Sequence, residues 1–599
     1  MKIKLKKIVD LSLTLVGSSI SNELPFIVSF MLLMGSVEVF QRMHGLMVSP
    51  DASISMLDLA KHIGLWFFMS FVVAVIINIS RRKSLLRICS YGIVLIFYII
   101  QQFLFVNFGT NITPTILTMI AETNSQETKD FVSSYILRSS NLDIFGNLIF
   151  VILFLFLFEF LYSKFLRGRL ADYKRIIGLI LTPPLLFGIY SCQVYRPFLS
   201  DMSTDAMRVQ TGHVSPQDPF TCLIRSVCLL HMSSKETDKA VNCTLNMSPP
   251  SYIGDDDDSL CVILVIGESY IKHHASIYGY PHETTPRLKQ MQEKGNLFVF
   301  NDVVTPYNST SRVLKNILSC NSIGDNQSWY NYPYLPAIFK KAGYDVFLWD
   351  NQHNADAFAD FAFTLDSYMY NSVLHRVSYS KCNEVSFSQD LPLIESYEQE
   401  AAKYPSNRLF TIFHLQGQHV DAKSRYPHEK PFVRFTQDSI ISQATYLTSE
   451  KKQRIADYDN ATYYNDSVIC RIVNIFKNDN AVLLYLSDHG DEVYDYRDQY
   501  GREHNPHLTD SCAYYEFEIP FMIWCSDKYR LSHPIIIEQL RHSIAKPFMS
   551  DNICQILFTI GSISTKYYHA ERDILNPLYK CPPRILQDRI NFDKLMDRP

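Results

Sequence analysis

The sequence has little net charge, no internal repeat and no low-complexity tract. Its 56 Lys and Arg residues are balanced by 60 Asp and Glu residues, which leaves a formal net charge of −4 over 599 residues. Such a balance gives no electrostatic reason to expect binding to nucleic acid or to another polyanion. The mean hydropathy of −0.02 is equally uninformative, because it averages a very apolar N-terminal part with a polar, His-rich remainder.

The N-terminus also lacks the short apolar core and small-residue cleavage site of a removable signal peptide. What it has instead is a series of long apolar runs, and a membrane-spanning helix needs about 20 such residues. The runs are Leu24–Gln41, His62–Ile79, Leu85–Phe108, Ile144–Phe165 and Ile176–Ile189. The sequence therefore predicts an α-helical membrane domain with five spans over residues 1–195.

Basic residues indicate the orientation of these spans. They cluster in "MKIKLKK" at the N-terminus, in Arg81–Lys83 and in Lys164–Arg175, which are alternate loops and so lie on one side of the membrane. Because short basic loops stay in the cytoplasm, we expect a cytoplasmic N-terminus and an exported chain after residue 195. Eleven of the thirteen cysteines would then lie in an oxidising compartment, where disulfides persist, although their pairing does not follow from sequence.

The exported part divides into a polar linker region, 196–258, and an α/β domain, 259–599. The linker ends in the acidic run Gly254–Asp258, which is typical of a solvated loop. After it, buried strands alternate with amphipathic helices, so we expect a mostly parallel sheet covered by helices on both faces. The expected strands are Leu260–Gly267, Tyr344–Asp350, Asn407–Gly417, Asn480–Gly490 and Glu518–Trp524, and the clearest helices are Tyr334–Gly343 and Ala456–Phe476.

Four of these strands end in reactive side chains. The ends are Gly267-Glu268-Ser269, Trp349-Asp350-Asn351, His414 with His419 soon after it, and Asp488-His489-Gly490. Ligands of open α/β sheets bind beyond the carboxyl ends of strands. Four such strand ends favour a functional site over surface decoration.

Asp488 and His489 offer one oxygen and one nitrogen ligand in a tight turn, a mixture that suits zinc. The dipeptide alone favours a turn cap beside a hydrogen-bonded histidine. Glu268, His419 and His504 at other element ends favour the metal site.

Glu268-Ser269 allows two interpretations. Ser269 could be the nucleophile of a strand-to-helix elbow with the pattern G-x-S-x-G, but Ile271 occupies the place of the second glycine. Glu268 could instead be a metal ligand, or an acidic residue stabilised by a helix N-terminus. Farther on, Thr285 followed by Pro286 predicts an N-cap and the first residue of a helix.

Several segments together resemble the phosphoethanolamine transferases, inner-membrane members of the alkaline phosphatase/sulfatase superfamily. The first is "VIGESYIKHHASIYGYPHETTPRL" (265–288), followed by "TPYNSTSRVLKNILS" (305–319) and "HLQGQHVDAKSRYP" (414–427). "LYLSDHGDEVYDYRD" and "EIPFMIW" resemble the final motifs of the family, and five spans before an exported domain also match. The resemblance covers nearly the whole chain.

The resemblance implies a zinc site and a threonine nucleophile. Glu268, Asp488 and His489 match zinc ligands, and Thr310 matches the nucleophile, which also contacts the zinc. The residues alone leave Ser309, Thr310 and Ser311 open, and only the family spacing selects Thr310.

The resemblance also implies substrate-binding residues. His419 matches a histidine near the phosphate or a second zinc. His504 matches the last functional histidine of the family, and His507 is its alternative. His414 matches a residue behind the site. Thr123 and Glu127 lie in "ETNSQET", a segment similar to one that approaches the lipid. His282 stands where the family commonly has arginine.

For the activity, the resemblance implies transfer of phosphoethanolamine from phosphatidylethanolamine to lipid A, lipopolysaccharide or another envelope glycan, with Zn²⁺ as cofactor. The catalytic domain would be periplasmic and the enzyme anchored in the inner membrane. A related phosphoglycerol transferase and a catalytically inactive membrane scaffold are the alternatives. A sulfatase is disfavoured, because no C/S-x-P-x-R segment occurs around residues 305–315.

Overall fold

The computed structural model describes residues 2–48, 56–108, 111–112, 116–117, 142–199, 218–255, 259–325, 327–352, 369, 371–401, 403–502 and 508–597. The chain forms two compact units, Met1–Met232 and Ser233–Pro599. The boundary between the two units lies within helix α10 (Pro219–Leu245). This part of the predicted polar linker region, 196–258, is therefore helical.

The N-terminal unit contains the five predicted apolar helices. They are α1 (Lys2–Val48), α2 (Met56–Ile79), α3 (Lys83–Phe108), α6 (Leu142–Phe165) and α8 (Lys174–Ser191). Each is long and apolar enough over part of its length to cross a membrane, and each contains one of the predicted spans. The expectation of an α-helical domain with five candidate spans is thereby confirmed. The short helix α7 (Arg167–Asp172) precedes α8.

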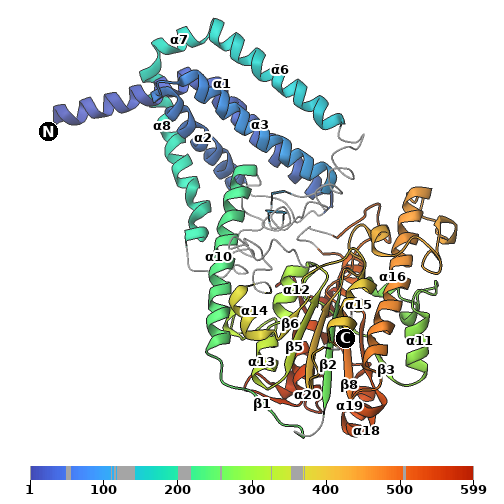
Figure 1. Ribbon diagram of the computed structural model, residues 1–599. Coiled ribbons are helices and arrows are strands. Elements are labelled where there is room, and N and C mark those ends of the chain that lie inside the picture. Colours follow the sequence, from blue (N-terminus) through green and yellow to red (C-terminus); the bar gives the residue numbers. More distant parts are fainter. Residues whose placement is uncertain are drawn as a thin grey trace. The chain divides into compact units, whose positions relative to one another are not determined.

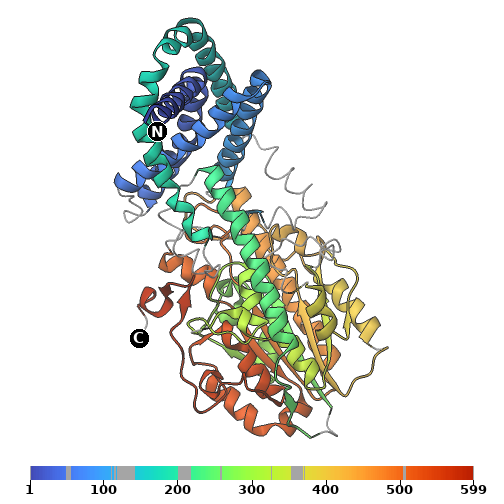
Figure 2. The ribbon, with the colours of Figure 1, turned by 90° about the vertical axis from the view of Figure 1, so that its left-hand side faces the viewer.

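Helices α1, α2 and α8 pack against one another within this unit (Figures 1 and 2). Small residues permit the close approach: a Cβ on Gly178 of α8 would lie 2.1 Å from the carbonyl oxygen of Leu13 in α1. Helices in a membrane associate through such close packing, because lipid supplies no hydrophobic driving force between them.

Two buried carboxylates inside these apolar helices have side-chain partners. The Arg87 guanidinium donates two hydrogen bonds, of 2.6 and 2.7 Å, to the Glu23 carboxylate, which is buried at a kink in α1. His62 Nδ1 lies 2.6 Å from Glu38 Oε1, and both side chains are buried. Pairing offsets the high cost of burying a charge in an apolar environment.

The C-terminal unit is built on a seven-stranded sheet in the order β3-β9-β8-β2-β7-β5-β6, counted over the described residues. The strands are β2 (Leu260–Gly267), β3 (Leu297–Phe300), β5 (Asp345–Asp350), β6 (Lys381–Cys382), β7 (Arg408–His414), β8 (Ala481–Ser487) and β9 (Phe521–Cys525). From β8 to β6 all neighbours are parallel, whereas β9 is antiparallel to both β8 and β3. The predicted mostly parallel sheet is confirmed.

Both faces of the sheet are buried, as the continuous apolar strands require. In β2, Val262, Leu264 and Ile266 belong to one hydrophobic core and Ile263 and Val265 to the other, which is the two-residue alternation of a strand. Helix α13 (Leu335–Lys341) lies on one side of the strands and α16 (Ser449–Phe476) on the other (Figure 1).

The main helices around the sheet are α11 (Pro286–Glu293), α12 (Thr310–Ile317), α13 (Leu335–Lys341), α15 (Asp390–Ala401), α16 (Ser449–Phe476), α19 (Pro534–Ser543) and α20 (Ile553–Ile560). Shorter helices are α14 (Ser372–Ser378), α17 (Asp510–Cys512), α18 (Asp527–Ser532) and α21 (Phe592–Leu595). Three small two-stranded sheets pair β1 (Ser251–Tyr252) with β11 (Ile563–Ser564), β4 (Val303–Val304) with β10 (Phe548–Met549), and β12 (Ile585–Leu586) with β13 (Ile590–Asn591).

The start of α11 differs in one detail from the sequence prediction. Pro286 is the first helical residue, as predicted, but the Thr285 side chain makes no cap hydrogen bond. Its hydroxyl accepts from the N–H of Ile277 instead, and Asp466 of α16 accepts from the free N–H groups of Arg287 and Leu288. A carboxylate distant in sequence therefore caps this helix, which local sequence cannot indicate.

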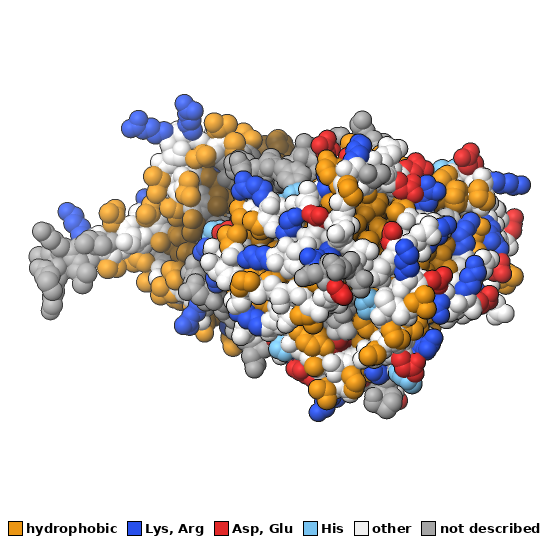
Figure 3. Space-filling view, turned by 60° about the horizontal axis from the view of Figure 1, so that its bottom comes forward, with side chains coloured by type: hydrophobic (Ala, Val, Ile, Leu, Met, Phe, Trp, Pro, Cys, Tyr) orange, Lys and Arg blue, Asp and Glu red, His pale blue; other side chains and the backbone are white. Residues whose placement is uncertain are grey.

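The charged surface agrees with the small net charge. On the face shown in Figure 3, Lys and Arg side chains are interspersed with Asp and Glu side chains.

Candidate active site

The candidate site lies where two neighbouring parallel strands end. Gly267 of β2 is in register with Ser487 of β8, so the residues that follow, Glu268 on one strand and Asp488 and His489 on the other, come together. All three are fully buried, and one ligand atom from each lies within 4.8 Å of the others. These are the three residues that the sequence indicated as metal ligands.

Asp488 has one oxygen fixed by the backbone and one oxygen available. Oδ1 accepts hydrogen bonds from the N–H groups of Ser269 at 3.0 Å and His489 at 2.7 Å. Oδ2 is buried and has no hydrogen-bond donor among the described residues. Burial opposes ionisation of this carboxyl, but the neighbouring His489 ring, the N–H of Ser269 and Arg502 outweigh it and hold its pKa below the usual range.

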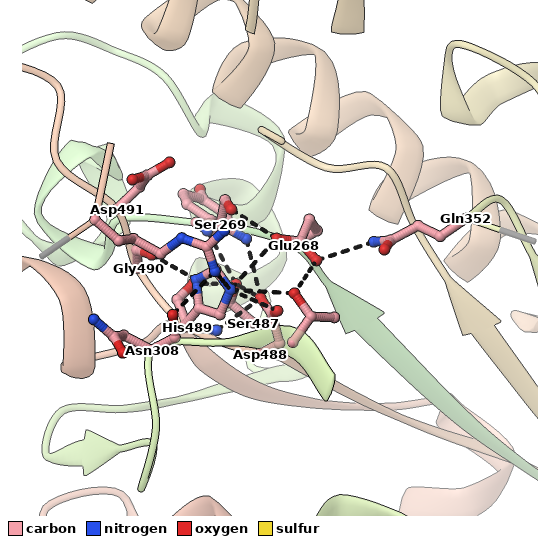
Figure 4. Close-up of polar contacts among 12 residues, drawn as sticks. Glu268, Ser269, Asn308, Gln352, Ser487, Asp488, His489, Gly490 and Asp491 are labelled. Atoms are coloured by element: carbon pink, nitrogen blue, oxygen red, sulfur yellow. Dashed lines mark hydrogen bonds and ion pairs between the residues drawn. The ribbon is translucent and has the colours of Figure 1, made fainter. Parts of the chain in front are cut away.

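His489 is oriented so that its Nε2 faces the cluster. Nδ1 lies 2.6 Å from the carbonyl oxygen of Gly490 and must donate to it, which leaves the lone pair on Nε2. Nε2 lies 3.0 Å from Asp488 Oδ2 and 3.5 Å from Glu268 Oε1 (Figure 4). A backbone carbonyl that fixes the outer nitrogen is the usual arrangement of a metal-binding histidine.

Gly490 is required for this turn. A Cβ at this position would lie 2.0 Å from the carbonyl oxygen of Tyr515, a distance that no side chain can occupy. The glycine of Ser487–Glu492 thus allows the backbone after β8 to pass close to the segment before β9, and this passage sets the position of His489.

Thr310 begins α12 and directs its hydroxyl into the cluster. Oγ1 donates to Glu268 Oε2 at 3.0 Å and lies 3.3 Å from His489 Nε2. Of the three neighbouring hydroxyl residues that the sequence left open, Thr310 is the one in these contacts, while Ser309 takes the N-cap position of the helix.

Ser269 supports Glu268 rather than facing a substrate. Its hydroxyl donates to Glu268 Oε1 at 2.7 Å, and the side chain is buried. Its backbone has a φ of 54°, in the left-handed region that residues with a side chain rarely adopt. Tyr458 fixes this conformation through its hydroxyl, which accepts from the N–H of Ile271 at 2.7 Å.

Gln352 is a site residue that the sequence did not single out. Its Nε2 donates to Glu268 Oε2 at 3.0 Å and to the carbonyl oxygen of Leu415 at 2.8 Å. In Figure 4 it reaches Glu268 from the opposite side to Asn308 and Asp491. The available signal was its place directly after the strand end Trp349-Asp350-Asn351.

The two predicted histidines near the cluster have opposite electrostatic surroundings. His414, at the end of β7, has Nδ1 2.9 Å from Asp350 Oδ1, while its buried Nε2 has no partner among the described residues. Burial lowers the pKa of His414, but Asp350 outweighs it and raises the pKa to about 9. Burial lowers the pKa of His419 to about 4, although Glu268 acts in the opposite direction. At neutral pH, His414 is therefore charged and His419 neutral.

Arg502 also contacts the cluster. Its NH1 lies 2.5 Å from His489 Nε2 and donates to the carbonyl oxygen of Asn308 at 3.0 Å. The sequence placed it beside His504 but assigned it no role. Four of the predicted site residues, Thr123, Glu127, His504 and its alternative His507, lie outside the described residues.

His282, in the position where the resemblance implies arginine, belongs to a separate polar network. Its Nδ1 lies 2.7 Å from Asp459 Oδ2, and the other oxygen of Asp459 lies 2.7 Å from His274 Nδ1. His274 also contacts Asp495 through Nε2, at 2.9 Å. This network ties the 265–288 segment to α16.

The residues present fit a zinc ion. Glu268, Asp488 and Thr310 offer oxygens and His489 a nitrogen lone pair, which is a four-donor set of the kind zinc takes. The orphaned Asp488 Oδ2 and the tautomer of His489 both agree with a cation at their centre.

Comparisons with known proteins agree with this geometry. Residues 261–551 match the Sulfatase family. The phosphoethanolamine transferase EptC of Escherichia coli K12 is 26% identical over 539 residues, which cover 88% of this chain and 86% of the relative.

Two solved structures are similar as well. The C-terminal periplasmic domain of E. coli EptC is 29% identical, with a TM-score of 0.50 over 58% of this chain and 97% of that domain. The integral membrane protein lipooligosaccharide phosphoethanolamine transferase A from Neisseria meningitidis has a TM-score of 0.58 over 94% of this chain and 97% of that protein. At 15% identity, this second likeness concerns the fold alone.

Proposed function

Because this chain belongs to the phosphoethanolamine transferase family, with its sulfatase-family domain over residues 261–551, we propose that it transfers phosphoethanolamine from phosphatidylethanolamine to an acceptor of the cell envelope. The main support is the position of the Thr310 hydroxyl, which donates to Glu268 Oε2 at 3.0 Å and lies 3.3 Å from His489 Nε2. A nucleophile beside a metal-ligand cluster is the arrangement that covalent phosphoryl transfer requires.

In the first step, Thr310 Oγ1 attacks the phosphorus of the donor. A P–O bond to Thr310 forms, the P–O bond to diacylglycerol breaks, and phosphoethanolamine remains on Thr310. The Thr310 hydroxyl loses its proton, and the leaving diacylglycerol oxygen takes one up, so the step is balanced. Zinc, when held by Glu268, Asp488, His489 and Thr310, lowers the pKa of a bound hydroxyl and polarises phosphoryl oxygens. Glu268 Oε2, which accepts the hydrogen bond of Thr310 at 3.0 Å, orients the attacking oxygen.

In the second step, a hydroxyl or phosphate oxygen of the acceptor attacks the same phosphorus and Thr310 is released. His419, neutral at pH 7 because burial lowers its pKa to about 4, can accept the proton of the acceptor. His414, charged through Asp350, supplies positive charge at the end of β7. We assign the same class of role to His504, and contact with the lipid to Thr123 and Glu127.

The name of one relative supports an acceptor class. A protein of Escherichia coli K12 that is 26% identical over 279 residues is named Kdo(2)-lipid A phosphoethanolamine 7''-transferase, which supports lipid A or lipopolysaccharide as acceptor, with another envelope glycan as the alternative. The five apolar helices support an inner-membrane location, with the N-terminus in the cytoplasm and the catalytic domain in the periplasm. A reporter fused after Arg81 should be cytoplasmic and one fused after Pro599 periplasmic.

The test uses the purified full chain, loaded with zinc, and fluorescent phosphatidylethanolamine or phosphatidylglycerol. We expect diacylglycerol release from phosphatidylethanolamine alone, and loss of that release in Thr310→Ala. Release from phosphatidylglycerol instead would establish a phosphoglycerol transferase. A protein that takes up no zinc on loading and releases diacylglycerol from neither lipid would be an inactive scaffold.

A further inference from the structure

Arg502 and Thr310 both contact His489 Nε2, the atom through which this histidine would bind a metal ion. Arg502 NH1 lies 2.5 Å from His489 Nε2, and Thr310 Oγ1 lies 3.3 Å from it. Nε2 carries a single lone pair, because Nδ1 is committed as a donor to Gly490. That lone pair can accept a hydrogen bond from Arg502 or bind a metal ion, but it cannot do both.

A metal on His489 therefore displaces the Arg502 guanidinium, yet the arginine stays beside the nucleophile. Its second hydrogen bond, of 3.0 Å, goes to the carbonyl oxygen of Asn308, two residues before Thr310. That bond uses the other hydrogen of the same NH1 group, so it can be kept when the contact with His489 Nε2 is lost. The Asn308 side chain is held in turn by Glu516 at 2.7 Å and by Gln587 at 2.6 Å, so this anchor is fixed.

The charge of the site leaves a role for this guanidinium. Glu268 and Asp488 are buried carboxylates that a divalent cation would neutralise. A phosphodiester brings a further negative charge, and attack by Thr310 increases the charge on its equatorial oxygens. A planar arginine fork matches phosphate oxygens in geometry and stays charged at every relevant pH.

We propose that Arg502 binds the phosphoryl group that is transferred, and that it becomes free to do so when a metal replaces it on His489 Nε2. The proposal deepens the proposed function and rests on it. It makes Arg502 both a competitor of the metal in the metal-free protein and a ligand of the phosphate in the loaded protein.

The two roles predict opposite changes in affinity when Arg502 is replaced. Replacing Arg502 by Ala removes a competitor, so zinc affinity should rise about 3-fold or more. The same change removes a charged hydrogen-bond donor, so the affinity of the zinc-loaded protein for inorganic phosphate should fall about 10-fold or more. A residue that merely held the site together would lower both affinities.

The experiment uses the full chain in detergent, with zinc affinity measured by competition with a chelator and phosphate affinity by calorimetry. Arg502→Gln, which keeps most of the length and can still donate to the Asn308 carbonyl, should give the same two shifts even if Arg502→Ala folds poorly. Arg471→Ala is the control, because it removes an arginine from an ion pair with Glu398 on the surface. It should leave both affinities unchanged.

Unchanged phosphate affinity in Arg502→Gln would overturn the proposal, and so would a fall in its zinc affinity. Phosphate binding needs no donor lipid, so the result does not depend on the proposed activity. A wild-type protein that binds phosphate through Arg502 but releases no diacylglycerol would contradict the proposed function and leave the assignment of Arg502 intact.

Discussion

Thr310 Oγ1 donates a hydrogen bond to Glu268 Oε2 over 3.0 Å, although the two residues are 42 positions apart. Glu268 follows a central strand of the sheet and Thr310 begins a helix beside it. The contact joins the proposed nucleophile to the proposed metal ligands, so the two form one site.

Glu268→Gln should lose bound zinc. The amide keeps the size of the side chain but removes the charge that a divalent cation needs. Zinc content of the purified protein after dialysis, measured by elemental analysis, checks this. Glu538→Gln, an exposed helix position paired with Arg541, is the control. One retained zinc per chain in Glu268→Gln would show that Glu268 is not a zinc ligand.

Gln352→Ala should weaken zinc binding by about 10–100-fold while leaving the fold intact. The change removes the Nε2 group that holds Glu268 Oε2 and connects it to the Leu415 carbonyl. Chelator competition gives the affinity. Gln290→Ala, on the exposed side of α11, should leave it unchanged. Wild-type affinity in Gln352→Ala would mean that Glu268 needs no such support.

Gly490→Ala should lose zinc and destabilise the catalytic unit. The added methyl group would lie 2.0 Å from the Tyr515 carbonyl oxygen, so the turn that carries His489 must shift. Gly168→Ala is the matched control, because a Cβ there meets no atom within 4 Å. Thermal melting and zinc content are the measurements. Wild-type values for both in Gly490→Ala would show that the turn tolerates a different path.

His274 should make stability fall as the pH rises above neutral. Burial lowers its pKa, but Asp495 and Asp459 outweigh burial and raise it to about 10, above its unfolded value near 6.5. The stabilisation is complete below the unfolded pKa and is lost as the pH rises through the folded pKa. Between these values the free energy of unfolding falls by about 1.4 kcal/mol per pH unit from this group.

The check is denaturant unfolding of the full chain at pH 7, 8 and 9. His274→Gln should be less stable than the wild type at pH 7, and its stability should change less with pH. Parallel curves for the two proteins would show that His274 is not charged in the native state. His542→Gln, an exposed histidine that contacts Glu538, is the control.

Much of the fold followed from the sequence because its signals are strong and local. Five apolar runs and a series of continuous apolar strands leave few other arrangements. Glu268, Asp488 and His489 were found because each directly follows a buried strand, and parallel strands bring their carboxyl ends to one edge. Thr310 needed the family resemblance, since nothing local distinguishes it from Ser309 and Ser311.

What the sequence missed depends on contacts between distant segments. Gln352 and Arg502 are ordinary polar residues until the fold places their nitrogen atoms against Glu268 and His489. The cap of α11 shows the same limit, because Asp466 takes the place expected for Thr285. Periodicity and turn chemistry describe neighbours in the chain, whereas these contacts arise from packing.

The proposed covalent mechanism is tested most directly by finding phosphoethanolamine attached to Thr310. The zinc-loaded protein is incubated with phosphatidylethanolamine without an acceptor, digested and analysed by mass spectrometry. We expect one phosphoethanolamine on the peptide that carries Thr310, lost in Thr310→Ala and retained in Ser269→Ala. Phosphoethanolamine on Ser269, or an unchanged adduct in Thr310→Ala, would contradict it.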